Sequence, residues 1–143
     1  MFIGEYSHSI DPKGRLAIPV KMRTKLDEGA VVTKGLDNCL FVYPRNEWEK
    51  LAEKLSNLPL TDSKSRAFSR LMLAGAMEVE FDKQGRILLP AYLREFASLK
   101  SDAVVAGLYN RIEIWNAEAW KTIKTQNEQN TEEISEHLSQ LGI

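Results

Sequence analysis

Residues able to carry covalent or metal chemistry are scarce in this sequence. Its 143 residues include one cysteine, Cys39, and two histidines, His8 and His137. A single cysteine excludes an intramolecular disulfide framework, and no Cys/His spacing resembles a zinc site. Because Cys39 lies in an apolar run, we interpret it as a packed strand residue. We interpret both histidines as surface or structural residues and expect no metal site.

Long hydrophobic runs are also missing. No segment approaches the roughly 18 apolar residues that span a bilayer. The opening residues, MFIGEY, lack the basic region and the apolar core of a signal peptide. We therefore expect a cytoplasmic protein without membrane association. No glycine-rich phosphate loop occurs either, since Gly14 and Gly85 stand alone in turns, so we expect no cofactor.

Neither sign of charge dominates, and the formal net charge is −1. Bulk charge therefore gives no indication of nucleic-acid binding. The charges are nevertheless unevenly distributed. Residues 11–25 contain five basic side chains and one acidic, and residues 82–94 contain three basic and one acidic. Residues 116–143 contain two lysines and five glutamates. Positive charge thus gathers on two short segments, and the C-terminal tail offsets it.

Those two segments are copies of one motif, Asp-x-x-Gly-Arg followed by proline. A constant shift of 71 residues relates five identical positions, Asp11/Asp82, Gly14/Gly85, Arg15/Arg86, Pro19/Pro90 and Arg23/Arg94. After one inserted residue, the match continues at a shift of 72 as far as Trp48 and Trp120. Most of the chain is therefore a duplication of one unit. We predict both tryptophans, like Trp115, to be core residues rather than platforms for stacked bases.

Each unit is predicted to run strand, turn, strand, short helix, strand, turn, strand, helix. In the first unit, residues 6–10 and 15–18 are predicted as two strands that pair with each other across the turn. Pro19 suits the first position of a helix, which we expect to be about two turns long. The second unit is expected to repeat this arrangement from residue 77 onward.

The remaining helices are predicted from their caps. Three later helices are expected to be capped by Asn46, by Thr61 or Asp62, and by Asn116. Residues 125–130 are polar and show no periodicity, which predicts a linker before a last helix that begins at Thr131. That helix carries only a thin apolar stripe, made of Ile134, Leu138 and Leu141. We expect the protein's own body or a neighbouring subunit to cover this stripe.

The Asp-x-x-Gly-Arg motif contains no catalytic constellation. Each aspartate lies four residues before an arginine, which indicates an ion pair that orders the turn more than acid–base chemistry. Arginine can bind phosphate or guanine through two parallel hydrogen bonds, and a two-stranded ribbon fits the major groove of DNA. We therefore predict that Arg15 and Arg86 contact DNA, while Lys13 and Lys83 neutralise phosphates.

Two other functions remain open at this stage. The Asp–Arg pairs could be structural staples in a ring-forming interaction protein that contacts no DNA. Alternatively, Asp11 or Asp82 could serve an uncharacterised hydrolase, although we expect no enzyme. The other basic side chains near the motifs are predicted to lie on solvated helix faces, and they are Lys21, Arg23, Lys25 and Arg94.

The doubled motif, together with the opening Met-Phe-x-Gly-Glu-Tyr, resembles the MraZ family of bacterial transcriptional regulators. The resemblance covers essentially the whole chain and is carried by Asp11, Gly14, Arg15, Pro19, Asp82, Gly85, Arg86 and Pro90. It implies an α+β fold of two tandem swapped-hairpin, AbrB/SpoVT-like half-domains that form an internal pseudo-dimer with a small β-barrel and flanking helices. We expect a first unit over residues 1–60, a connecting helix over 61–75, a second unit over 76–124 and an acidic helical tail over 125–143.

The resemblance also implies a function. The family's DNA-binding motif falls on residues 11–15 and 82–86. The implied DNA-binding residues are Arg15, Arg86, Lys13 and Lys83, supported by Asp11, Asp82, Gly14 and Gly85. The implied partners are double-stranded DNA and further copies of the chain in a ring-shaped homo-oligomer. The DNA would carry short direct repeats upstream of the division and cell-wall gene cluster, including the protein's own promoter. The protein would then lie in the cytoplasm, associated with the nucleoid.

Overall fold

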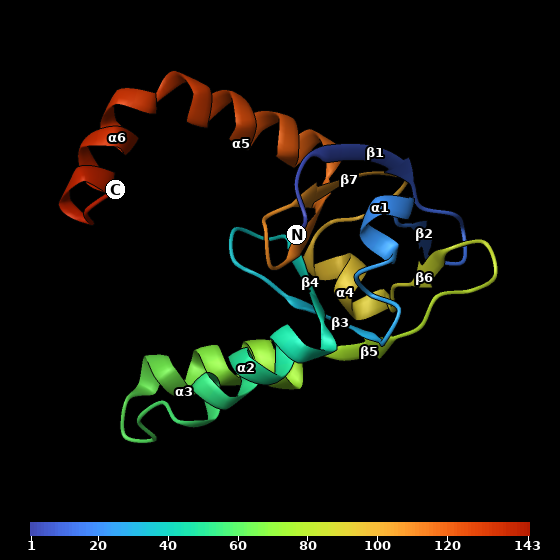
Figure 1. Cartoon of the computed structure of the whole chain (residues 1–143), viewed down its shortest axis with the longest axis horizontal. Coiled ribbons are helices and arrows are strands. Elements are labelled where there is room, and N and C mark those ends of the chain that lie inside the picture. The colour runs from blue at the N-terminus through green and yellow to red at the C-terminus, as the bar shows by residue number, and fades with distance from the viewer.

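The two halves of the chain interlock in one α+β structure, as Figure 1 shows. The computed structural model describes all residues from 1 to 143. In chain order the elements are β1 (Glu5–Ser9), β2 (Arg15–Ala17), α1 (Val20–Arg23), β3 (Ala30–Lys34), β4 (Leu40–Pro44), α2 (Arg45–Ser56), α3 (Ser63–Ser69), η1 (Arg70–Ala74), β5 (Met77–Val79), β6 (Arg86–Leu88), α4 (Ala91–Phe96), β7 (Asp102–Gly107), β8 (Ile112–Asn116), α5 (Ala117–Gln129) and α6 (Thr131–Gln140). None of the helices combines the length and the apolar character that crossing a membrane requires.

Most strands of one half pair with strands of the other. Six strands form an antiparallel sheet in the order β1-β7-β8-β4-β3-β5, and β2 and β6 form a separate two-stranded ribbon. The pairs β1–β7, β8–β4, β3–β5 and β2–β6 each join the two halves. The α+β class is therefore confirmed. The large sheet ends in two edges, β1 and β5, and therefore does not close into the small barrel that was expected.

The predicted pairing within the first unit is correct only next to the turn. There an isolated bridge joins Ile10 to Leu16, and the backbone N–H of Asp11 donates to the carbonyl of Arg15, whereas β1 itself pairs along its length with β7. Strand β2 pairs instead with its duplicate β6, so that Leu16 lies opposite Ile87. Both side chains are buried in the main core. A three-residue strand buries its inner side chain better against a matching partner than against the exposed strand β1, because the two apolar faces then share one core.

Alternating side chains divide the sheet's contacts between two cores. In β4, Leu40 and Val42 belong to the main core, and Phe41 and Tyr43 point to the opposite face, as strand geometry requires. The main core lies between the sheet, the β2–β6 ribbon, α1 and α4. The second core is covered by α2, η1 and α5. It includes Trp115 and, at its rim, the partly buried Trp48 and Trp120, so the predicted packing of the tryptophans is confirmed.

The predicted helix starts are partly correct. The side chains of Asp62 and Asn116 accept hydrogen bonds from backbone N–H groups three residues on, which confirms both caps. Asn46 is not a cap, because α2 already begins at Arg45 after Pro44. Pro19 likewise precedes its helix, which is a single turn rather than two. Proline fixes φ near the helical value but leaves ψ extended at both of these positions.

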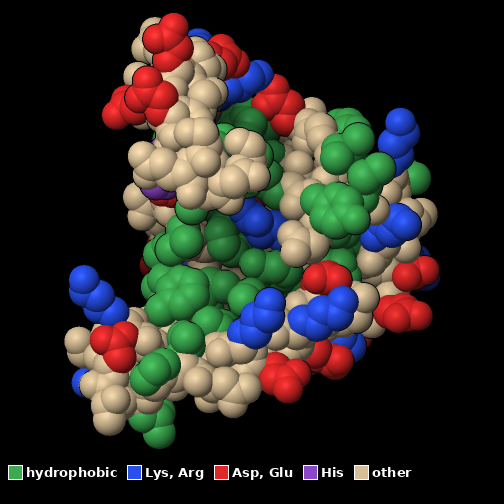
Figure 2. All heavy atoms as spheres, turned by 60° about the vertical axis from the view of Figure 1, so that its left-hand side comes forward, with side chains coloured by type: hydrophobic (Ala, Val, Ile, Leu, Met, Phe, Trp, Pro, Cys, Tyr) green, Lys and Arg blue, Asp and Glu red, His purple; other side chains and the backbone are tan.

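Two helical arms project from the sheet. Helices α2 and α3 form one arm, and α5 continued by α6 forms the other (Figure 1). The linker predicted over residues 125–130 is wrong, because α5 runs through to Gln129. No residue of α6 is buried, so its apolar stripe is not covered within the chain. Figure 2 shows hydrophobic side chains gathered in the hollow between the arms. Both arms contribute partly buried side chains to the second core, among them Trp48, Phe68 and Ile123.

Candidate nucleic-acid interface

The β2–β6 ribbon brings both copies of the motif onto one surface. Antiparallel pairing sets Arg15 opposite Leu88 and Ala17 opposite Arg86. Because the intervening Leu16 and Ile87 are buried, all four of these side chains lie on the outward face. The turns that precede β2 and β6 lie at opposite ends of the ribbon, since backbone hydrogen bonds join Gly14 to Leu89 and Gly85 to Ile18.

The first aspartate orders its turn and holds its arginine. One carboxylate oxygen of Asp11 accepts hydrogen bonds from the backbone N–H groups of Lys13, at 3.0 Å, and Arg15, at 2.9 Å. The other oxygen accepts the Nε–H of Arg15 at 2.6 Å. Side-chain and backbone contacts thus fix the turn together, as the Asp-x-x-Gly-Arg spacing predicts.

The second motif repeats this geometry. Asp82 accepts the backbone N–H groups of Gln84 and Arg86, each at 2.9 Å, and the Nε–H of Arg86 at 2.8 Å. One contact breaks the symmetry, because Nη1 of Arg86 also lies 3.6 Å from the carboxylate of Asp11. Arg86 is therefore shared between two carboxylates, whereas Arg15 pairs with one.

Both carboxylates are stabilised in the charged form. Hydrogen bonds from the backbone N–H groups of Arg15 and Arg86 are the largest cause that lowers the pKa of Asp11 and Asp82 below the usual range. A general acid needs the opposite shift, toward neutral pH. Because each aspartate accepts the Nε–H of its arginine, the terminal amino groups of Arg15 and Nη2 of Arg86 remain as donors, while Nη1 of Arg86 also lies near Asp11. The arrangement therefore presents two oriented guanidinium groups rather than an acid–base pair.

Two further arginines, Arg23 and Arg94, support the turns, so the prediction that they lie on solvated helix faces is wrong. Gly14 and Gly85 have φ of +87° and +74°, in the region that favours glycine. A side chain at Gly14 would meet the guanidinium of Arg94, and one at Gly85 would meet that of Arg23. Nε of Arg94 also donates to the carbonyl of Leu89 at 2.9 Å. Each arginine thus packs on the turn of the other unit. The available sequence signal for this role was that Arg23 and Arg94 are related by the same shift of 71 residues as the motif itself.

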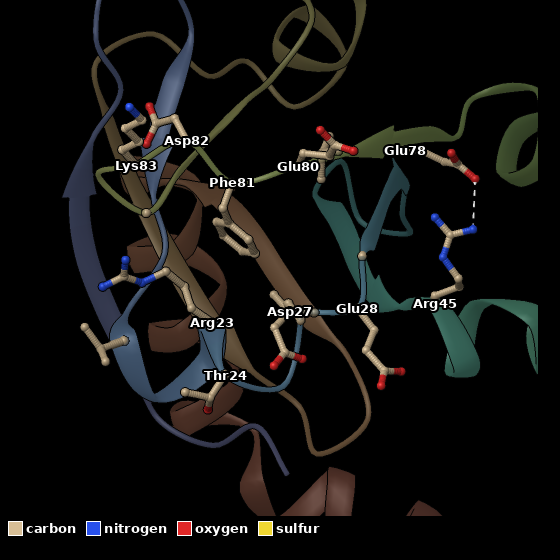
Figure 3. A pocket seen from close by; sticks show the side chains of 15 residues that line it. Arg23, Thr24, Asp27, Glu28, Arg45, Glu78, Glu80, Phe81, Asp82 and Lys83 are labelled. Carbon is tan, nitrogen blue, oxygen red and sulfur yellow. Dashed lines mark hydrogen bonds and ion pairs between the residues drawn. The ribbon is translucent and has the colours of Figure 1, made fainter.

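The two turns differ in their surroundings. Ile10 is tied to the large sheet by a backbone hydrogen bond to Ser101. On the other side, pairing of β5 ends at Val79 opposite Ala30, and a cavity of about 1030 Å³ opens beside the second turn. Figure 3 shows Arg23 and Phe81 between this turn and the segment that carries Asp27. The second turn therefore borders an open cavity, whereas the first follows a residue that is bonded to the sheet.

The structure places the predicted site residues as follows. Both arginines and both aspartates lie together on the ribbon, while Lys13 and Lys83 are exposed on the turns at its two ends. Gly14 and Gly85 form the turns themselves. No group of three or more His, Cys, Asp or Glu side chains is arranged to hold a metal ion. Cys39 is buried, and burial raises the pKa of its thiol to about 12, as expected of a packed residue.

Known proteins match this chain along its whole length. A family model described as "MraZ protein, putative antitoxin-like" matches twice, over residues 1–71 and 72–141. Relatives named transcriptional regulator MraZ are 52% identical in Natranaerobius thermophilus, over the full length of both chains, and 53% identical in Heliobacterium modesticaldum, over 96% of each. Another, from Desulfitobacterium hafniense, is 52% identical over the full length of both chains. With both copies of the motif matched, the chain belongs to the MraZ family.

Proposed function

We propose that this protein is a sequence-specific, DNA-binding transcriptional regulator that reads DNA with the outward face of its β2–β6 ribbon. The observation that carries the proposal is the pair of carboxylate-held guanidinium groups of Arg15 and Arg86 on one face of a two-stranded ribbon. A ribbon of this kind fits the major groove, where a guanidinium can bond to O6 and N7 of guanine. The relatives' names, transcriptional regulator MraZ, support the same function.

The charges on the ribbon assign different contacts to its arginines and to its lysines. The carboxylates of Asp11 and Asp82 offset the charge of the two arginines, so the attraction to phosphates falls to Lys13 and Lys83 at the ends of the ribbon. Lysines placed there bind the backbone without reading sequence, and their contribution weakens as salt rises. The arginines between them supply hydrogen bonds to base edges.

The cross-pairing of the halves supports the finer assignment of the fold. In a swapped-hairpin half-domain of the AbrB/SpoVT kind, strands are exchanged between two copies of a unit. Here β1 and β2 of one unit pair with β7 and β6 of the other. We therefore propose that the chain is an internal pseudo-dimer of two such half-domains, with the doubled motif at their shared surface.

The uncovered apolar surfaces support the proposed ring-shaped homo-oligomer. The hollow between the arms exposes part of the second core (Figure 2), and α6 leaves its stripe open, with Ile134 and Leu141 exposed. A second copy, whose arms carry the same surfaces, is the occupant we propose. Several weakly binding ribbons in one assembly would gain on the order of 10²–10⁴ in avidity on DNA with repeated sites.

The proposed target is DNA with short direct repeats upstream of the division and cell-wall gene cluster, including the protein's own promoter, bound at the nucleoid. The test is a titration of wild-type protein with a labelled promoter duplex and with a scrambled duplex of equal length, at two salt concentrations. We expect preference for the promoter duplex at both. Equal, salt-sensitive binding to both duplexes would instead support an interaction protein whose Asp–Arg pairs are structural.

Replacement of both aspartates tests whether they orient the arginines. In Asp11→Asn/Asp82→Asn the side-chain oxygen can still accept backbone N–H groups, but the acceptor for each arginine Nε is lost. Two freed arginines must then be ordered on binding, so we expect affinity for the promoter duplex to fall on the order of tenfold. Loss of two negative charges alone would strengthen binding.

The matched control is Glu132→Gln/Glu133→Gln, which removes the same charge from the exposed start of α6. Fluorescence anisotropy should show unchanged or slightly tighter binding of this variant to the promoter duplex. Tighter promoter binding by the aspartate variant as well would show that the carboxylates only repel DNA.

A further inference from the structure

We propose that Leu88 contacts the C5 methyl group of a thymine next to the guanine that Arg15 binds, and that this contact gives the ribbon a reading direction. The inference rests on the proposed function. It starts from the exposure of Leu88, whose side chain is 57% exposed although its neighbours Ile87 and Leu89 are buried. Leu88 belongs to neither hydrophobic core.

The fold explains where Leu88 points but not why it is leucine. Strand alternation turns residue 88 outward because residues 87 and 89 point into the main core. The first unit has Ala17 at the equivalent place, so a small side chain is sufficient for the ribbon. A single exposed leucine is ordinary on a protein surface. Leu88 differs because its face of the ribbon is the one that carries both oriented arginines.

The register of the ribbon places Leu88 beside Arg15. The two residues are directly opposed in β2 and β6, and opposed side chains in an antiparallel pair have Cβ atoms about 4.5–5.5 Å apart. Successive base pairs are about 3.4 Å apart along DNA. If Arg15 binds a guanine, Leu88 therefore reaches the adjacent base pair. The C5 methyl of thymine is the apolar group that base edges offer in the major groove.

The other end of the ribbon lacks this feature. Arg86 lies opposite Ala17, whose side chain is a single methyl group and reaches less far from the ribbon than that of Leu88. The turns differ as well, since Pro12 and Lys13 in one correspond to Lys83 and Gln84 in the other. A two-fold symmetric reader matches palindromic half-sites. A ribbon with Leu88 at one end and Ala17 at the other distinguishes the two directions along the duplex, as reading of direct repeats requires.

The experiment replaces thymines of the bound promoter duplex one at a time by deoxyuridine, which removes only the C5 methyl. We expect one position in each repeat at which wild-type protein binds about fourfold more weakly, the effect of one buried methyl-sized group. In Leu88→Ala, affinity for the unmodified duplex should fall about three- to tenfold, and deoxyuridine at that position should have no further effect. Such non-additivity is the signature of direct contact.

The exchange variant Ala17→Leu/Leu88→Ala provides a second readout. Its sensitivity to deoxyuridine should move to a thymine beside the guanine bound by Arg86. Circular dichroism should show that both variants keep the wild-type fold, because the altered side chains lie on the outward face. The assignment is overturned if no single deoxyuridine weakens wild type, or if Leu88→Ala remains equally sensitive. Those results leave the proposed function standing wherever the promoter duplex is still preferred to the scrambled one. Absence of that preference in wild type would remove both.

Discussion

Arg15→Ala/Arg86→Ala should abolish preference for the promoter duplex while the protein stays folded. Each bidentate contact to a base contributes about 1–3 kcal/mol of discrimination, so loss of two should lower specific affinity at least about thirtyfold. Avidity enlarges the effect when several ribbons bind together. Weak, salt-sensitive binding should remain, because Lys13 and Lys83 are unchanged. Anisotropy titrations with the promoter duplex and the scrambled duplex measure both the loss of preference and the remaining non-specific binding.

The control for this variant removes the same charge elsewhere. Lys54→Ala/Lys121→Ala deletes two exposed cations from α2 and α5, away from the ribbon, and should retain the promoter preference. Analytical ultracentrifugation of both variants reports on assembly. If the arginine variant keeps its DNA preference, Arg15 and Arg86 are not the base contacts. If it loses its oligomeric mass and its fold together, the Asp–Arg pairs are structural staples.

Leu16→Ala should cause a large loss of stability. Leu16 is 0% exposed, lies opposite Ile87 on the inner face of the ribbon and belongs to the main core. Truncation of a buried leucine costs about 2–5 kcal/mol, through lost burial and a residual cavity. A typical domain has only about 5–15 kcal/mol in total. We expect a midpoint roughly 4–20 °C lower in thermal melts, taken at equal protein concentration since assembly also stabilises.

Leu88→Ala is the matched control, because it makes the same change on the same ribbon but on the outward face. We expect its free energy of unfolding to change by less than about 0.5 kcal/mol. Urea titrations of both variants give the difference directly. Equal losses at the two positions would contradict the inward and outward assignment of the ribbon's faces.

The geometry of the motif could be predicted from the sequence because it is local. The spacing from Asp11 to Arg15 lets one carboxylate accept hydrogen bonds from two backbone N–H groups and from the arginine of the same turn, so five consecutive residues carry the information. Caps at Asp62 and Asn116 were predictable for the same reason. By contrast, the partner of β2 lies about 70 residues away, and alternation alone does not say which strand will share its core.

The supporting arginines show the same limit. Arg23 and Arg94 lie in short helices at positions that suggest solvent, and only the three-dimensional arrangement places each on a glycine of the opposite unit. The start of α2 at Arg45 was missed because the preceding proline is itself a favourable entry to a helix. Continuation of α5 across residues 125–130 was missed because polar residues in an exposed helix leave no apolar period to read.

The interlocked halves have a consequence for how the chain folds as it is made. Glu5 finds its partner at Ala106, about 100 residues later, which a ribosome adding about 5–20 residues per second supplies after roughly 5–20 s. During that interval the first unit has bare strand edges and no ribbon partner. The unpaired strands of the nascent chain can therefore associate with other chains until its own second half emerges and pairs with them.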